Sequence, residues 1–480
     1  MKRNIVILAL CSLILIPAYA QDSAKVAKQE KKEAVKSHLK QHFKPYGFIR
    51  NYFTYDSRES WSGTADLYNY QPKDQKLNDY GDDLNAESTF RFLSLTTRLG
   101  LNLVDYKWRG TEFGGKIEAD FYAGLSTKTS SVDSKIKETH AVSGVAQFRL
   151  RQAYLTLGWD SLKMLGGKDY ARVDLTIGQT WHPMAADLCD AIALNSGAPF
   201  GPFNRSPQVK MDARLGKYVT LTAAGLWQMQ YLSIGPGNLQ SAEYMLYGKT
   251  PEAYLGLSVH TNGFLMRAGA DVLSIKPRHQ GTVADATLGK DVTVHVNDRI
   301  TTASPFLYLQ YKKGDFSLKA KTIFAESGER MNMYGGYGVK AKNADGSYEY
   351  TPIRHSTSWV SLVYGGKVGA QEEKHPQKLQ GILFAGYVKN FGTKEALMDL
   401  NGDGKYTNAE LFTPRSSAMN QMYRLSPTLL YTVGKFQLGL EYELTSVQYG
   451  DGVLDDHGLS KNGLHWVSNH RVQLMTKYNF

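Results

Sequence analysis

The chain has 480 residues, of which 42% are hydrophobic, and a formal net charge of +11. Residues 1–44 hold nine Lys and Arg against three acids and so supply +6, which leaves only +5 for the rest of the chain. The positive charge is therefore concentrated in one short leader, and this balance excludes a nucleic-acid-binding surface spread over the protein. A mean hydropathy of -0.37 and the absence of a later apolar run of spanning length exclude a bundle of membrane-spanning helices.

The first residues have the pattern of a secretory signal. A positively charged start precedes an apolar run over 5–16, and Ala18 to Ala20 form a small-x-small cleavage site, so residues 1–20 are predicted to be a signal peptide. An uncleaved anchor is the alternative, but the run is too short to cross a bilayer as a helix. The remaining chain keeps one cysteine, Cys189, which excludes an internal disulfide.

Residues 21–44 form the next segment, which is rich in Lys, Ala and Glu and has no Gly or Pro. This composition predicts a short basic helix that ends before Pro45. Two interpretations stay open: a solvated tether, and a helix that packs against copies of itself.

From residue 46 onward the hydrophobic pattern has a period of two. In the stretch 92–104, every second position from Leu93 to Leu103 is a leucine except for Thr97, and Arg98 falls on the other face. The stretch 112–124 alternates in the same way. Charges at every second position of an apolar strand do not suit the core of a sandwich, whereas they can face a water-filled interior while the apolar side faces lipid.

Sixteen such stretches are each long enough for a tilted spanning strand of about 9–11 residues. They are 46–56, 90–104, 112–124, 148–159, 171–181, 208–216, 218–230, 252–261, 264–275, 303–312, 315–326, 357–367, 379–390, 423–433, 436–447 and 470–480. Tight turns mostly follow the even-numbered strands, and long gaps follow the odd ones. This alternation predicts an all-β fold, a transmembrane antiparallel β-barrel of about 16 strands over residues 45–480. A sandwich would not sort its loops in this way, and a propeller or solenoid would show a repeat.

The chain ends in an alternating strand whose last residue, Phe480, is aromatic. This looks like the signal that the barrel assembly machinery of the outer membrane reads. Aromatic residues near strand ends are typical of the two interfacial girdles against lipid. The candidates are Tyr55, Trp159, Trp227, Trp359, Tyr442 and Tyr478.

Several segments resemble the sixteen-stranded trimeric porins of Gram-negative outer membranes, and in particular the DcaP-like group. They are the leader 22–44, the first strand 47–58, the segment 148–154 and the Gly-Gln-Thr-Trp stretch 178–181. The resemblance implies a bacterial outer-membrane location, a homotrimer, a periplasmic leader helix, and passive diffusion of small polar or anionic solutes.

In that family the loop after the fifth strand folds into the lumen and narrows it. The matching segment here is 182–207, so the resemblance implies a constriction that bears Asp187, Asp190 and Arg205. The alternative is an outer loop folded over its neighbours.

Strand parity selects the charged residues expected on the lumen wall. The basic ones are Arg50, Arg98, Lys116, Lys210, Arg214 and Arg267, and the acidic ones are Glu118, Asp120, Asp174, Asp212 and Asp271. Arginines on a pore wall attract anions and offer forked donors to carboxylates, which favours a weak anion preference. The alternative of a wall with mixed charges, which lets polar solutes of either sign diffuse, is not excluded by the sequence.

The segment from Asp399 to Glu410 fits the twelve-residue calcium loop D-x-[DN]-x-[DN]-G-x5-E. The expected ligands are the side-chain oxygens of Asp399, Asn401, Asp403 and Glu410, the backbone carbonyl of Lys405, and Thr407 directly or through water. The loop lies between the thirteenth and fourteenth predicted strands, so a bound Ca²⁺ would face outward in a structural role. A polar Asp/Gly turn is the alternative.

The sequence has no phosphate-binding glycine loop, nucleophile elbow or paired-histidine zinc motif, and we expect no enzyme. Two function classes remain. One is a passive diffusion channel, and the other is a barrel that acts through its long outer loops as an adhesin or surface receptor.

Overall fold

A computed structural model describes residues 41–63, 68–94, 96–122, 147–163, 170–192, 197–369, 376–413 and 418–480. The predicted signal peptide 1–20 and almost all of the predicted leader 21–44 lie outside these residues. No helix of the described residues is long and apolar enough to cross a membrane.

The structure is a closed antiparallel barrel of sixteen strands, as predicted. The barrel strands are β1 (Phe43–Asp56), β4 (Thr89–Leu93) with β5 (Arg98–Trp108), β6 (Thr111–Tyr122), β7 (Gln147–Lys163), β8 (Tyr170–Trp181), β9 (Arg205–Leu215), β10 (Val219–Leu226), β13 (Glu252–Thr261), β14 (Phe264–Ile275), β17 (Ile300–Lys313), β18 (Phe316–Glu326), β20 (Tyr348–Tyr364), β21 (Gln377–Thr393), β23 (Met419–Val433), β24 (Phe436–Tyr449) and β25 (His465–Asn479). Each predicted stretch corresponds to one of these strands.

Short elements decorate the long connections. They are β2 (Ser60–Gly63), β3 (Tyr68–Pro72), β11 (Ile234–Gly235), β12 (Leu239–Gln240), β15 (Gln280–Asp285), β16 (Lys290–His295), β19 (Tyr337–Lys342), β22 (Leu411–Phe412), helix α2 (Glu243–Gly248) and the 3₁₀ turns η1 (Pro183–Ala185), η2 (Pro236–Asn238) and η3 (Gly328–Met331).

The first and last strands close the barrel. β1 pairs with β25 in an antiparallel register from Phe48↔Asn479 to Asp56↔Arg471, and the Phe480 N–H donates to the Gly47 carbonyl at 3.1 Å. The sheet therefore has no free edge along this seam, which is what a strand structure in lipid requires.

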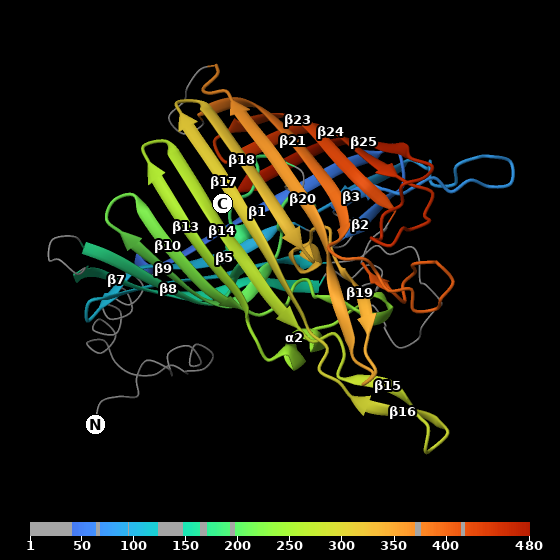
Figure 1. The fold of residues 1–480 in the computed structure, drawn as a ribbon. Helices are drawn as coiled ribbons and strands as arrows, with labels where there is room; N and C mark the ends of the chain where they lie inside the picture. Colours follow the sequence, from blue (N-terminus) through green and yellow to red (C-terminus); the bar gives the residue numbers. More distant parts are fainter. Residues whose placement is uncertain are drawn as a thin grey trace, which may run out of the picture.

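Turns and long connections are sorted to opposite ends of the barrel (Figure 1). Several of the tight turns use glycines with positive φ, such as Gly216 at 63°, Gly314 at 56° and Gly434 at 54°, because a left-handed conformation costs an L side chain energy. At the other end the hairpin of β15 and β16 projects away from the wall.

One predicted strand is not continuous. The sequence suggests that alternation runs unbroken through 90–104, but the structure interrupts it between β4 and β5. Because of the break, odd-numbered side chains point into the barrel before it and out of the barrel after it. Leu93 points inward at 7% exposure and packs on Tyr70 and Phe203, whereas Leu99 faces outward. The expectation that Leu93 shares the outer face with Leu99 is therefore wrong, and the loops that cover Leu93 inside the barrel are the physical reason.

The two faces of the wall differ in polarity and burial. Along β17, Phe306 and Tyr308 are buried inward and Leu307 and Leu309 are exposed outward. The outer face is apolar, as lipid requires. The prediction for Trp359 is also wrong. Its side chain points inward and is 3% exposed, so it cannot belong to the outer aromatic girdle.

Candidate functional site

Segment 182–207 follows β8 and contacts the inner wall through three basic side chains. Arg267 of β14 pairs with Asp187 at 3.1 Å. On β18, Lys319 pairs with Asp190 at 2.8 Å, and the ammonium group of Lys321 donates to the Asp187 carbonyl at 3.2 Å. Both predicted acids of the segment therefore pair with the wall, and the Asp190 side chain is still 31% exposed.

The same segment is bonded to strands on other sides of the barrel. The Tyr52 hydroxyl of β1 donates to the Ile192 carbonyl at 2.7 Å, and the Ile192 N–H donates to Glu441 of β24 at 3.1 Å. The Thr357 hydroxyl of β20 donates to the Phe200 carbonyl at 2.6 Å. Since these strands surround the interior, segment 182–207 runs across the lumen.

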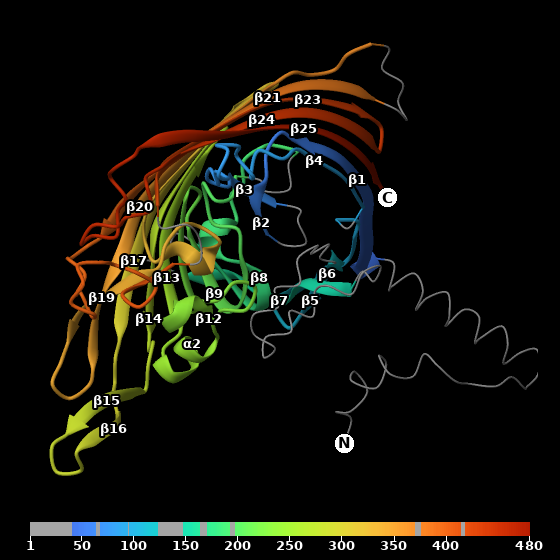
Figure 2. The same cartoon turned by 90° about the vertical axis from the view of Figure 1, so that its right-hand side faces the viewer.

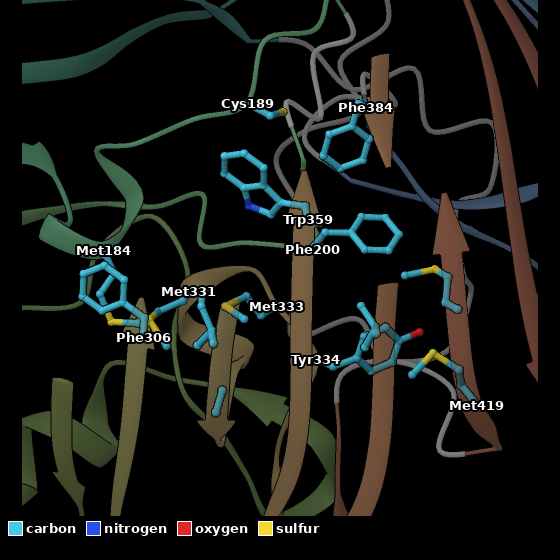
Figure 3. Packing of buried hydrophobic residues seen from close by; sticks show 14 of the residues in the cluster. Met184, Cys189, Phe200, Phe306, Met331, Met333, Tyr334, Trp359, Phe384 and Met419 are labelled. Atoms are coloured by element: carbon cyan, nitrogen blue, oxygen red, sulfur yellow. The ribbon is translucent and has the colours of Figure 1, made fainter. Parts of the chain in front are cut away.

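An apolar cluster fills one sector of the interior between this segment and the wall (Figure 3). Phe200 from the segment packs on Phe384 of β21 with ring centroids 5.9 Å apart, and Trp359 contacts the same ring at 6.3 Å. Met331, the last residue of η3, belongs to the cluster as well. The inward side chains along β17 to β23 are therefore largely covered.

Part of a second connection, the stretch around β3 between β1 and β4, also lies inside. Arg424 of β23 donates to the Asn69 carbonyl at 2.6 Å and to the Ala198 carbonyl at 3.0 Å, so one buried guanidinium links both inward segments. Figure 2 shows β2 and β3 within the outline of the barrel wall. The sequence predicted an ordinary outer loop here. From the alternation along its strand, Arg424 could have been predicted to point inward, but nothing in the sequence indicated which residues it would contact.

The opposite sector of the wall, along β5 to β9, keeps charged side chains that solvent reaches. Most of the predicted basic residues there are ion-paired. The pairs are Arg98–Glu118 at 3.5 Å, Lys210–Asp212 at 2.6 Å and Arg214–Asp174 at 3.2 Å. The Arg98 side chain is 20% exposed and that of Arg214 55%. Arg205 instead is buried and lies over the Trp181 ring at 4.8 Å.

Two arginines that the sequence reasoning missed complete this network. Arg149 donates to both carboxylate oxygens of Asp120 at 2.9 and 3.0 Å. Arg151 reaches Glu118 at 3.0 Å and Asp120 at 2.5 Å. Both lie on β7 beside a register shift, which is why simple alternation did not select them.

Three cations gather around Phe48 on the inner face of β1. Arg50 and Arg98 lie 5.0 Å from the ring centroid, and Lys477 of β25 lies 4.6 Å from it. Arg98 is paired with Glu118, but Arg50 and Lys477 have no ion pair among the described residues. Arg50 donates to the Thr96 hydroxyl at 2.9 Å. The group, which we call the Phe48 cation cluster, carries more positive than negative charge.

Lys116 is the other predicted basic residue without an ion pair among the described residues. Its ammonium lies 5.1 Å from the Tyr46 ring centroid. The Tyr46 hydroxyl in turn donates to Glu118 at 2.7 Å. Lys116 therefore adds positive charge beside the Phe48 cation cluster.

The predicted calcium loop forms a compact outer turn. Asp399 accepts the backbone N–H groups of Gly402 and Gly404 at 2.7 Å each, and the Gly404 donor, followed by its neighbours, lowers the pKa of Asp399. Glu410 accepts from Asn401 at 3.3 Å, which brings positions three and twelve together. The acidic side chains of this loop do not bring three ligand atoms within 4.8 Å of one another. Among the described residues, such a group is formed by His182, Glu252 and Asp271.

No family model matches the chain, and no curated protein matches it. Among solved structures it is similar to the outer membrane channel DcaP of Acinetobacter baumannii, with 19% identity over 91% of this chain and 97% of that chain and a TM-score of 0.59. It is also similar to an anion-selective porin from Comamonas acidovorans, with 10% identity over 91% and 99% of the two chains and a TM-score of 0.43. The first comparison shows a shared fold. The closed barrel is the fold that this chain shares with that outer membrane channel.

Proposed function

We propose that this chain, which has the sixteen-stranded barrel fold of outer-membrane porins, lets small polar solutes diffuse passively with a weak preference for anions. The observation that carries the proposal is the Phe48 cation cluster on a wall that solvent reaches, opposite the sector that segment 182–207 fills. In such a passage, charged wall groups act on passing ions at short range.

The electrostatics favour this preference. Arg50 and Lys477 lie where a low-dielectric wall and partial burial weaken screening, so their field extends into the passage more strongly than that of exposed surface charges. The ion pairs along β5 to β9 contribute paired charges that keep the wall polar without a large net sign. The expected selectivity is therefore modest, because only a few charges are left uncompensated.

Assembly and location follow from the same proposal. We infer a homotrimer in the outer membrane, in contact with lipid through the apolar belt. Phe480 is half exposed beside the start of β1, where the assembly machinery could read it. Signal cleavage after residue 20 and a periplasmic leader belong to this proposal and concern residues outside the described structure.

A surface receptor or adhesin is the second candidate. It is favoured by the apolar cluster of Figure 3, which occupies part of the lumen, and by the projecting hairpin of β15 and β16. In that case the inward segments would act as a plug, and the outer loops would carry the activity.

We further propose that the loop from Asp399 to Glu410 binds Ca²⁺ as a structural ion. The convergence of Asn401 and Glu410 supports it. Asp399, Asp403, the Lys405 carbonyl and Thr407, directly or through water, would complete the ligand set. Affinities of extracellular calcium modules are weak, with a Kd of roughly 10⁻⁴–10⁻³ M, so the ion would stiffen this loop and not act as a signal.

Single-channel recording of the folded protein in a planar bilayer tests the main proposal. Under a salt gradient we expect stepwise conductance, in threes for a trimer, with a reversal potential on the anion-selective side. Silent bilayers from demonstrably folded protein would contradict the channel and favour the receptor candidate.

A further inference from the structure

A buried group of charged side chains lies where segment 182–207 leaves the wall. His182 follows β8, Glu252 begins β13 and Asp271 lies on β14, and all three are fully buried. One ligand atom from each lies within 4.8 Å of the others. Arg330 of η3 contacts both carboxylates, through its Nε to Glu252 at 2.9 Å and through Nη2 to Asp271.

Each of the three residues keeps one buried polar atom without a hydrogen-bond partner. These atoms are His182 Nε2, Glu252 Oε2 and Asp271 Oδ1. Buried polar atoms are almost always hydrogen-bonded, and one left alone costs free energy. Two of them, His182 Nε2 and Asp271 Oδ1, lie 3.5 Å from each other, which points to a missing ligand between them.

The spacing fits coordination better than hydrogen bonding. His182 Nε2 lies 3.5 Å from Glu252 Oε1 and 3.5 Å from Asp271 Oδ1, which is too long for a hydrogen bond to either oxygen. Ligand atoms about 2.0–2.2 Å from a tetrahedral zinc ion lie about 3.3–3.6 Å from each other. The observed distances match that separation.

The charge balance also favours a cation. Arg330 compensates only one of the two carboxylates, and a lone buried charge is strongly disfavoured. His182 Nδ1 accepts the Met184 N–H at 3.1 Å, so the ring has no place for a second proton while that bond stands. While that bond stands, the group lacks one positive charge unless one carboxyl group is protonated, and a bound cation would supply that charge.

We propose that His182, Glu252 and Asp271 form a binding site for a divalent transition-metal ion of the Zn²⁺ class. One imidazole and two carboxylates are the ligand types such ions take, whereas Ca²⁺ and Mg²⁺ prefer oxygen alone. Arg330 orients the carboxylates from behind, as outer-shell partners of metal ligands commonly do. The ion would tie the start of segment 182–207 to β13 and β14.

Binding has a structural consequence at η1. A metal at Nε2 leaves the ring proton for Nδ1, where it meets the Met184 N–H, so that hydrogen bond must break. The occupied and empty forms therefore differ at the first turn of segment 182–207. A second proton on His182 would break the same bond, and the experiment must separate the two.

The test uses full-length protein purified in detergent without a polyhistidine tag and stripped with EDTA. Co²⁺ is the probe, because its visible absorption reports tetrahedral coordination, and Zn²⁺ content is measured by mass spectrometry. We expect one equivalent per chain. We expect the affinity to fall by about 100-fold or more in His182→Ala, and similarly in Glu252→Gln.

His465→Ala is the matched control, because it removes another histidine, one paired with Asp74, and should bind as the parent does. Folding of each variant is checked by its heat-dependent electrophoretic mobility. If His182→Ala fails to fold, a rise in the melting temperature of the parent protein with Zn²⁺, absent in Glu252→Gln, decides the matter. No binding by the folded parent, at any pH at which it stays folded, or binding by both ligand variants as tight as that of the parent, would overturn the proposal. Conductance is a separate readout, so the channel proposal can stand or fall independently.

Discussion

Arg50 and Lys477 are register partners across the strand pair that closes the barrel. Like charges placed opposite each other destabilise a strand pair, and the two share the Phe48 ring instead of an acid. A barrel built for stability alone would pair one of them with a carboxylate, as Asp56 is paired with Arg471 at 2.8 Å farther along the same seam. The proposed anion preference therefore rests most directly on the positive charge at Arg50 and Lys477, which is unpaired among the described residues.

Neutralising Lys477 should reduce anion selectivity. For Lys477→Gln we expect the ratio of anion to cation permeability to fall by about twofold, because one of the few uncompensated wall charges is removed. Reversal potential under a salt gradient measures it. Lys217→Gln, in the turn after β9, is the control and should leave the ratio unchanged. An unaltered reversal potential in Lys477→Gln would contradict the role of the Phe48 cation cluster.

Releasing segment 182–207 from the wall should widen the passage. Lys319→Met removes the cation that pairs with Asp190 at 2.8 Å and leaves that carboxylate without its partner. We expect a higher and noisier single-channel conductance, since the segment loses one attachment. Lys313→Met, at the turn after β17, serves as the control. Identical conductance in both variants would show that the Lys319–Asp190 pair does not hold the constriction.

Calcium should protect the loop from Asp399 to Glu410 against proteolysis. With millimolar Ca²⁺ we expect cleavage within this loop to slow by a few fold relative to EGTA, in line with a weak extracellular site of Kd roughly 10⁻⁴–10⁻³ M. Glu410→Gln should remove the calcium effect because position twelve supplies a bidentate ligand. Equal protection in the variant, or none in the parent protein, argues for a plain polar turn.

Acid should loosen the same loop. The backbone N–H groups, that of Gly404 foremost, lower the pKa of Asp399. A depressed folded-state pKa contributes stability that is present above the unfolded value of about 3.9 and is lost as the pH falls through the folded value. Amide hydrogen exchange of residues 399–410, corrected for intrinsic rates, should therefore rise below about pH 4. Asp399→Asn should be insensitive to pH in this range.

Cys189 should be inert in the folded barrel. Burial, followed by the charges of Asp190 and Glu441, raises the pKa of its thiol, and only the thiolate reacts. At pH 8 we expect maleimide to label folded protein at least about 100-fold more slowly than protein unfolded in denaturant. Fast labelling of the folded form would mean that the packing of segment 182–207 against Phe384 opens readily.

The alternation of polar and apolar residues was sufficient to predict the strands of the barrel wall. Alternation from Leu99 to Leu103 and in its counterparts predicted all sixteen strands, because a strand between lipid and water must present one polar and one apolar face. The prediction of which face a side chain occupies failed where contacts with distant parts of the chain place an apolar residue on the inner face. Leu93 and Trp359 are apolar residues on the inner face, and the side chains that cover them come from connections distant in sequence.

The sequence by itself determined the barrel, its strand number and the sorting of its turns, since each depends on residues within one strand or one turn. Only the tertiary structure decided which charges stay uncompensated. Parity placed Arg50, Arg98 and Arg267 on the same wall, but Arg267 pairs with Asp187 and Arg98 with Glu118, while Arg50 keeps no acid among the described residues. Ion pairs form between residues far apart in the chain, and their energies depend on distances and burial that no local pattern encodes.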